Sequence, residues 1–373
     1  MPYWAIPPYG NCTDASAFEL LNVDPKDPQF QKQIVGYKRS NPELKLVASV
    51  GGWNYPSAFF SEMVSTAENR AIFVNSAKAY IARNNLDGID IDWEYPCSPP
   101  RTNSVKITDS KFQIVHDAGG NCPADTQNLP LLLNDLRAGL GADAIITVAS
   151  QAAHANFLAM NLTAAVDAVD AFHVMTYDYW VSDLSNAALT APNAPLHIPP
   201  SGTTGAANLN MSIEHTIDFY LAAGIPASKV HVGIPLYGHT FYVPDAGDQW
   251  NTFGIVAQKQ GKCFGPLKDT YGGQPAPGTN LCGTISYAEL LAANPDKVHE
   301  DAATGSTIAY FSSAQDGQYC CGAGTWVSFN GPSSIAGITS FAQARLHYYF
   351  RLNALLFTAT AWIFIPAYCF AVP

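Results

Sequence analysis

Three carboxylic acids alternate with apolar residues in one short segment, residues 86–96 (LDGIDIDWEYP). The two-residue alternation of a β-strand places Asp90, Asp92 and Glu94 on one face, with their carboxylates roughly 6 to 7 Å apart. The opposite face then holds the apolar residues Ile89, Ile91 and Trp93. Like charges this close in an apolar site do not all ionise, so at least one pKa must rise. A carboxyl group with a raised pKa is what a general acid needs at neutral pH.

Two other interpretations of these acids are weaker. The pattern D-x-D-x-E also opens an EF-hand calcium loop, but Tyr95 stands where that loop needs glycine, and Arg101 stands where it needs glutamate. A purely structural strand would be destabilised by three acids on one inner face. The segment therefore indicates catalysis, and we expect no metal site.

Strand-like and helix-like segments alternate along the chain, and this order positions the acids. Apolar runs rich in β-branched residues occur at 46–50, 86–91, 144–149, 171–175 and 229–235. Helical periodicity lies between them at 73–83, 129–140 and 213–223. This order indicates βαβ units and a parallel sheet, either a (β/α) barrel or a doubly wound sheet. No G-x-G-x-x-G follows an early strand, so a dinucleotide cofactor has no support.

The alternation of strand-like and helix-like segments ends after residue 240. Residues 241–312 are rich in Gly and Pro and then contain short alternating segments at 283–287 and 307–311. A plain loop of that length is improbable. We therefore expect a barrel domain made of residues 1–240 and 312–351, a small α+β insertion domain at 241–311, and an apolar tail at 352–373.

Composition narrows the class of protein. The chain has 373 residues, of which 48% are hydrophobic and 13% charged, with a formal net charge of −11. A basic nucleic-acid binder is excluded, and so is a largely disordered chain. The 28 Gly, 26 Pro and 12% aromatic residues suit a loop-rich fold with exposed rings. Such surfaces are common in proteins that handle neutral polymers.

Cysteine usage favours an oxidising compartment. Cys97 and Cys122 bracket one loop and Cys263 and Cys282 another, which suits two loop disulfides, although spacing alone does not fix the pairing. Glycosylation sequons at Asn11, Asn161 and Asn210 fit a secreted protein. Residues 1–9 lack the pattern of a signal peptide.

The uncharged segment 352–373 leaves several interpretations open. It is long enough to span a bilayer or to form the removable tail of a lipid-anchored protein. We favour a buried last strand or non-native sequence over membrane attachment.

The acidic segment and four others together resemble glycoside hydrolase family 18, the chitinases. Residues 87–94 (DGIDIDWE) match the D-G-x-D-x-D-x-E pattern of that family. In the same order as in the family, residues 49–53 (SVGGW), 175–178 (MTYD), 233–238 (GIPLYG) and 286–289 (SYAE) resemble its S-x-G-G-W, M-x-Y-D, G-x-P-x-Y-G-R and insertion-domain patterns. The likeness extends from about Lys45 to Ile335.

The resemblance implies a fold and a reaction. The expected fold is a (β/α)8 TIM-type barrel with the site at the carboxyl ends of its strands. The implied reaction cleaves β-1,4-linked N-acetylglucosamine polymers with retention, because the substrate's own acetamido oxygen attacks the anomeric carbon. The resemblance implies no cofactor, a monomer, chitin or chito-oligosaccharides as partners, and an extracellular location.

The family pattern also assigns roles to residues of this chain. Glu94 is the expected acid and base, Asp92 holds the acetamido N–H and exchanges a proton with Glu94 or Asp90, and Tyr177 donates to the acetamido oxygen. The expected substrate-binding residues are Gly52, Trp53, Tyr95, Met175, Asp178, Trp180 and Tyr237. For Trp53 and Trp180 a place in the hydrophobic core is the competing interpretation.

The chain also departs from the family. His239 stands where G-x-P-x-Y-G-R has arginine, which weakens a sugar contact. Only 48 residues precede Ser49 and show no clear strand pair, and the sequence from Ala336 onward does not match the family's last strand. We therefore expect a barrel that is incomplete at its first strands and last strand, with exposed strand edges that reduce solubility and activity.

Three functions remain to be compared. The first is an endo-acting or exo-acting chitinase. The second is a non-catalytic chitin-binding lectin on the same scaffold, which the presence of Glu94 disfavours. The third, a membrane-attached wall protein, has only the apolar tail in its favour.

Overall fold

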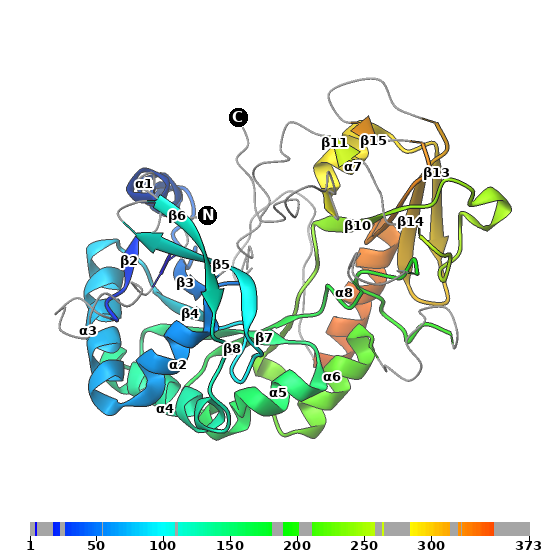
Figure 1. The fold of residues 1–373 in the computed structure, drawn as a ribbon. Helices are drawn as coiled ribbons and strands as arrows, with labels where there is room; N and C mark the ends of the chain where they lie inside the picture. Colours follow the sequence, from blue (N-terminus) through cyan, green and yellow to red (C-terminus); the bar gives the residue numbers. More distant parts are fainter. Residues whose placement is uncertain are drawn as a thin grey trace. The chain divides into compact units, whose positions relative to one another are not determined.

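The computed structural model describes residues 4–5, 18–22, 27–53, 55–108, 111–180, 189–200, 211–257, 263–264, 284–313, 320–321 and 323–346. The chain forms two compact units, shown in Figure 1. The first unit comprises Met1–Val174, Ala223–His231 and Arg351–Pro373, and the second comprises Met175–Ala222 and Val232–Phe350.

A seven-stranded sheet holds the acidic segment. Its order is β2-β1-β3-β4-β7-β8-β9, and β3 and β7 lie parallel to β4 on either side. The strands are β1 (Trp4–Ala5), β2 (Leu21–Asn22), β3 (Val47–Gly51), β4 (Gly88–Asp92), β7 (Ile145–Gln151), β8 (Ala171–Met175) and β9 (Val230–Val232). The five strands expected from apolar runs are confirmed as β3, β4, β7, β8 and β9. This arrangement of parallel strands is that of the expected barrel-type α/β fold.

The region before Ser49 differs from expectation. Two short strands lie there, β1 and β2, of which β1 is parallel to β3 and β2 is antiparallel to β1. The interpretation that this region has no strand pair was wrong. Each strand has two residues, which is too short to produce a pattern of alternating hydrophobicity.

Helices cover the outer face of the parallel sheet (Figure 1). Thr66 accepts a hydrogen bond from Asn69 N at the start of α3, and Gly141 ends α4 with a positive φ of 89°. The helices of this unit are α1 (Asp27–Gly36), α2 (Ser57–Ser65), α3 (Ala67–Arg83), α4 (Ala124–Leu140) and α5 (His154–Met160), with 3-10 turns η1 (Tyr37–Arg39), η2 (Leu162–Ala165) and η3 (Ala227–Lys229). The helices expected at 73–83 and 129–140 are confirmed as parts of α3 and α4.

The segment that connects β4 to α4 is linked to α2 by the carboxylates of Asp117 and Asp125. It contains the hairpin β5 (Arg101–Thr108) and β6 (Lys111–Asp117) and is closed by the Cys97–Cys122 disulfide, one of the two expected pairings. Asp125 Oδ2 accepts hydrogen bonds from Ser61 Oγ and from Cys97 N. Asp117 accepts from the first backbone N–H groups of α2, which satisfies donors that Pro56 at the helix start does not.

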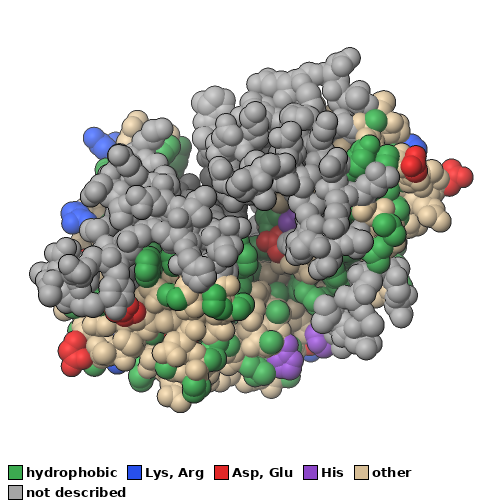
Figure 2. All heavy atoms as spheres, viewed as in Figure 1, with side chains coloured by type: hydrophobic (Ala, Val, Ile, Leu, Met, Phe, Trp, Pro, Cys, Tyr) green, Lys and Arg blue, Asp and Glu red, His purple; other side chains and the backbone are tan. Residues whose placement is uncertain are grey.

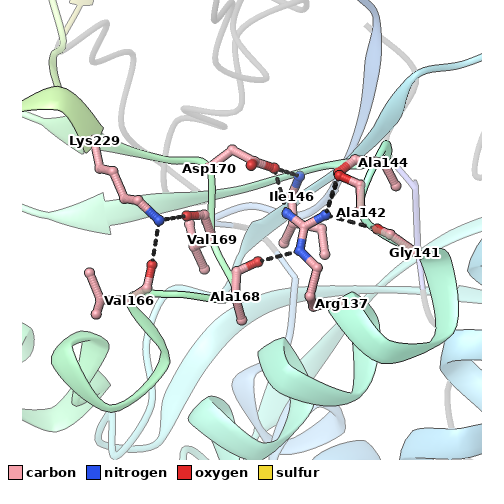
Figure 3. A network of polar contacts seen from close by, with 10 residues as sticks. All are labelled: Arg137, Gly141, Ala142, Ala144, Ile146, Val166, Ala168, Val169, Asp170 and Lys229. Atoms are coloured by element: carbon pink, nitrogen blue, oxygen red, sulfur yellow. Dashed lines mark hydrogen bonds and ion pairs between the residues drawn. The ribbon is translucent and has the colours of Figure 1, made fainter.

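A polar network joins the amino ends of β7, β8 and β9 (Figure 3). Arg137 on α4 donates to the carbonyls of residues 141, 142, 144 and 168 and forms an ion pair with Asp170. Asp170 also accepts from Ile146 N, and Lys229 donates to the carbonyls of Val166 and Val169. These two cations satisfy backbone carbonyls where the chain turns between helix and strand.

The second unit contains an antiparallel sheet of order β12-β10-β16-β14-β13. Its strands are β10 (Tyr237–Tyr242), β12 (Thr284–Ser286), β13 (Lys297–Asp301), β14 (Ser306–Phe311) and β16 (Thr325–Phe329). One face packs Phe311 and Val327 with Leu290, and the other packs Phe241 and Ile308 with Trp326. The sheet extends on both sides of the expected insertion 241–311, whose boundaries stay a prediction.

Helices and a small ribbon complete the second unit. Arg345 on α8 forms an ion pair with Asp218 on α6, so these two helices are linked. The elements are α6 (Ile213–Ala222), α7 (Tyr287–Ala293), α8 (Pro332–Leu346), η4 (Gly247–Gln249), β11 (Cys263–Phe264) and β15 (Cys320–Cys321). The helix expected at 213–223 is confirmed as α6.

Several sequence predictions concern residues outside the described ranges. These are the apolar tail 352–373, the Cys282 partner of the second loop, and the sequons at Asn11 and Asn210. Within the described ranges, no helix is both long and apolar enough to cross a bilayer. Among the coloured side chains of Figure 2, Lys and Arg stand singly and form no broad basic surface on that face.

Candidate active site

Asp90 lies in the middle of a row of three side chains that crosses the parallel sheet. Ser49 on β3 and Thr147 on β7 are the register partners of Asp90 on β4. Ser49 Oγ donates to Asp90 Oδ2 at 2.7 Å, and Thr147 Oγ1 donates to Asp90 Oδ1 at 2.6 Å. The carboxyl group is fully buried, and burial raises its pKa to about 6, although the two hydroxyl donors oppose that rise.

Asp92 is a buried acid whose pKa is raised by several causes. Burial raises its pKa well above the usual range, and the charges of Glu94 and Asp90 and a hydrogen bond with Glu94 raise it further. Within the described part of the chain, its Oδ1 atom is buried and has no hydrogen-bond partner. Asp92 therefore holds a proton that it shares with Glu94, and it keeps one oxygen for another donor.

Two glycines let β3 approach this acid closely. Gly52 N donates to the Asp92 carbonyl at 2.7 Å, and Gly51 has a φ of 114°. A Cβ atom on Gly51 would lie 2.2 Å from the Asp92 carbonyl oxygen and 2.8 Å from the Phe60 ring. Glycine is therefore required at this position by both conformation and space.

Glu94 follows the end of β4 and is only partly buried, unlike the two aspartates. Tyr95 Oη donates to Glu94 Oε2 at 2.8 Å. On the opposite face, Trp93 is fully buried, stacks on Phe60 at 5.2 Å and donates from Nε1 to Ser57 Oγ. The predicted alternation of apolar and acidic faces is confirmed. It gives a row of acids that starts inside the protein and ends at a partly exposed carboxylate.

Trp53 offers an exposed ring beside this row. Its side chain is 50% exposed, and its ring centroid lies 6.4 Å from that of Tyr95 at an angle of 57°. The interpretation of Trp53 as a core residue was wrong. A tilted pair of rings, of which Trp53 is exposed and Tyr95 is partly buried, provides apolar faces on which a pyranose can pack.

In the second unit, Asp178 accepts hydrogen bonds from two side chains of β10. Tyr237 Oη lies 2.7 Å and His239 Nε2 2.6 Å from Asp178 Oδ1. Tyr177 packs edge-on against Tyr237 with ring centroids 6.1 Å apart. The structure therefore brings together three of the predicted residues, Tyr177, Asp178 and Tyr237, and adds His239 to them.

Asn193 is a residue that the sequence did not reveal. It is fully buried, and its Oδ1 atom accepts from Asp178 N while its Nδ2 atom donates to the Tyr237 carbonyl. These contacts span 15 and 44 residues along the chain, so no local pattern predicts them.

The last two predicted residues of this unit differ in burial. Met175 is buried at the end of β8. Trp180 is partly buried beside Tyr179, and within the described ranges its buried Nε1 atom has no hydrogen-bond partner. In the described residues, no cluster of three His, Cys, Asp or Glu side chains is arranged to hold a metal ion.

Comparison with known proteins gives a consistent result. Residues 10–346 match the family described as Glycosyl hydrolases family 18. Chitinase A1 of Niallia circulans is 33% identical over 218 residues, which is 55% of this chain and 28% of that protein. The matched region thus spans under a third of that relative's length.

Solved structures of similar fold include one described as a chitinase and one described as a pseudo-chitinase. The Ostrinia furnacalis Group IV chitinase in complex with allosamidin superposes with a TM-score of 0.70 at 25% identity, covering 92% of this chain and 80% of that one. Human YKL-39, described as a pseudo-chitinase with retained chitooligosaccharide binding, superposes with a TM-score of 0.67 at 18% identity, covering 88% and 78%.

Proposed function

Since the chain belongs to the glycosyl hydrolases of family 18, we propose that it cleaves β-1,4-linked N-acetylglucosamine polymers with retention, with Glu94 as general acid and base. The observation that supports this proposal best is the contact between Asp92 and Glu94. A buried carboxyl with a strongly raised pKa lies against a partly exposed one, so the pair holds a proton at neutral pH.

In the first step, Glu94 transfers this proton to the glycosidic oxygen. The bond between that oxygen and the anomeric carbon breaks, and the substrate's acetamido oxygen forms a new bond to the anomeric carbon. The product is a bicyclic oxazolinium ion, and no carboxylate of the protein bonds to the sugar. The protein supplies the proton and the electrostatic stabilisation of the positive charge.

Asp92 and Tyr177 make the acetamido group an effective nucleophile. The role proposed for Asp92 is to accept the acetamido N–H through Oδ1, which has no hydrogen-bond partner within the described residues, and the role proposed for Tyr177 is to donate to the acetamido oxygen. The hydroxyls of Ser49 and Thr147 hold the Asp90 carboxylate, whose charge raises the pKa of Asp92. Asp90 thus influences the pKa of the pair of acids, Asp92 and Glu94, that share a proton.

In the second step, water attacks the anomeric carbon. Glu94, now deprotonated, takes a proton from this water while the bond to the acetamido oxygen breaks. Two inversions at one carbon give overall retention, and the acid is restored for the next cycle.

The substrate-binding roles follow from exposure and donor type. Trp53 and Tyr95 offer ring faces to the sugar, and Gly52 lets the chain approach closely. The proposed substrate contacts of the second unit are Met175, Trp180, Asp178 and Tyr237.

The Cys97–Cys122 disulfide supports an extracellular location, because disulfides persist in oxidising compartments. We assign a monomer acting on chitin or chito-oligosaccharides.

The anomeric form of the first product tests this proposal. Proton NMR of a chito-oligosaccharide digest should show the β-anomer first, with the α-anomer appearing only by mutarotation. A matched oligomer of glucosamine without acetyl groups should not be cleaved. Binding of the acetylated oligomer without any turnover would instead identify a lectin, as the description of YKL-39 illustrates.

A further inference from the structure

His239 and Tyr237 lie two residues apart on β10, so their side chains share one face of the strand. Both donate to the same atom, Asp178 Oδ1, from Nε2 at 2.6 Å and Oη at 2.7 Å. Two donors on one carboxylate oxygen fix the orientation of the whole carboxylate plane. Oδ2 is then left to accept from a group outside this cluster.

The backbone of Asp178 is fixed as well. Its φ is 56°, a conformation that non-glycine residues rarely adopt. Its N–H donates to Asn193 Oδ1 at 2.9 Å, and Asn193 Nδ2 donates to the Tyr237 carbonyl at 3.2 Å. Asn193 thus ties Asp178 to the strand that holds its two side-chain donors.

The side chains of His239 and Asp178 differ in solvent exposure, and this difference indicates different roles. The His239 side chain is 6% exposed, whereas that of Asp178 is 42% exposed. The imidazole is therefore buried, whereas the carboxylate that it contacts is open to solvent. Arginine has five donors in a fork and can serve two partners at once, but the Nε2–H of His239 is used entirely by Asp178.

We propose that His239 is a positioning residue that holds Asp178 so that its Oδ2 atom accepts a hydrogen bond from a hydroxyl of a neutral sugar. This inference rests on the proposed function, since it assigns the partner of one of its binding residues. A carboxylate oxygen accepts only, so the Nε2 nitrogen of His239 must be the one that bears hydrogen.

Steady-state kinetics on a chito-oligosaccharide give the first test, with four variants. His239→Ala should raise KM about tenfold with little change in kcat. The hydrogen bond between Asp178 and the sugar is then no longer held in place, and that bond stabilises the ground state and the transition state equally. His239→Gln keeps an N–H donor at a similar reach and should restore KM to within about twofold. His239→Asn has the same amide on a shorter side chain and should stay as weak as the alanine variant.

His197→Gln is the matched control. His197 also contacts a carboxylate, Glu214, at 2.8 Å in the same unit, but neither residue belongs to the proposed site. Its KM should equal that of the parent. Equal KM values for the parent and all three His239 variants would overturn the inference while leaving the proposed function intact.

Nitrogen-15 NMR of the histidine rings tests the contact without any substrate. The parent should show His239 in the Nε2–H tautomer, assigned by the signal lost in His239→Gln. In Asp178→Ala the acceptor is gone, and the ring should become a mixture of tautomers. The same tautomer in both proteins would overturn the inference, whether or not the protein cleaves chitin.

Discussion

Thr147 Oγ1 and Asp90 Oδ1 are 2.6 Å apart, and this hydrogen bond joins β7 to Asp90 on β4, the first of the three acids in the row. Both side chains are fully buried. A buried charge without donors costs several kcal/mol, so the hydroxyl offsets part of the cost of keeping Asp90 ionised. Stability and proton distribution in the acidic row therefore depend on a residue that takes no part in the chemistry.

Replacing Thr147 should reveal this coupling. Because the folded-state pKa of Asp90 is raised to about 6, above an unfolded value of about 3.9, its cost to stability builds up between these two pH values and is complete above about pH 6. Thr147→Val should lower the free energy of unfolding by about 1 to 3 kcal/mol near neutral pH. The loss should be smaller below about pH 4, where Asp90 is protonated in the folded and unfolded states.

Urea denaturation at the two pH values measures this effect. Thr147→Ser keeps the hydroxyl and serves as the control, with a stability close to that of the parent. A valine variant that loses the same free energy at both pH values would show that packing, rather than the charge of Asp90, explains the loss.

Asp92→Asn should lower kcat by at least about a hundredfold, because the amide cannot hold the proton shared with Glu94. The pKa of Asp92 is raised, so its titration contributes to the acid limb of the rate profile, and that limb should shift in the variant. The measurement is kcat/KM as a function of pH. A near-normal rate with an unchanged profile would assign Asp92 a structural role only.

Two histidines in the first unit, one buried and one partly buried, should make the fold sensitive to acid. His173 on β8 and His231 on β9 have their Nδ1 atoms 3.2 Å apart. Burial lowers the pKa of His173 to about 4. Burial, together with the charge of His173, lowers the pKa of His231 to about 3. Their neutral forms contribute stability that is complete above the unfolded pKa of about 6.5 and is lost as the pH falls toward 4.

Each histidine should therefore cost up to about 1.4 kcal/mol per pH unit below about pH 6.5. The double variant His173→Asn, His231→Asn should lose less stability between about pH 7 and about pH 5 than the parent does. His154→Asn replaces an exposed histidine and should behave as the parent. Equal pH dependence of the double variant and the parent in chemical denaturation would contradict this explanation.

Asp117 should stabilise α2 from outside the helix. It accepts from Ser57 N at 2.9 Å and from Ala58 N at 3.1 Å, two of the first four N–H groups of the helix, which have no partner within the helix. Asp117→Ala should cost about 1 to 2 kcal/mol of stability, measured by thermal unfolding. Asp143→Ala, on an exposed aspartate, is the control and should leave Tm unchanged. An unchanged Tm in the Asp117 variant would exclude this capping role.

The acidic strand could be predicted from sequence because one short segment contains both the two-residue alternation of a strand and the three carboxylic acids. The same alternation places Thr147 beside Asp90 once the neighbouring strand is known. Asn193 could not be predicted, since its partners Asp178 and Tyr237 are brought near only by folding. His239 was visible as a departure from the family pattern, but its role depends on burial that a sequence does not give.

The most direct test of the central claim is the activity of Glu94→Gln, which removes the transferable proton and keeps the shape. On a chromogenic chitobioside the variant should retain less than one per cent of the parental turnover, in keeping with loss of a general acid. Calorimetry should show chito-oligosaccharide binding within about threefold of the parent, because binding does not need that proton. Turnover above that level with intact binding would contradict the assignment of Glu94 as the acid.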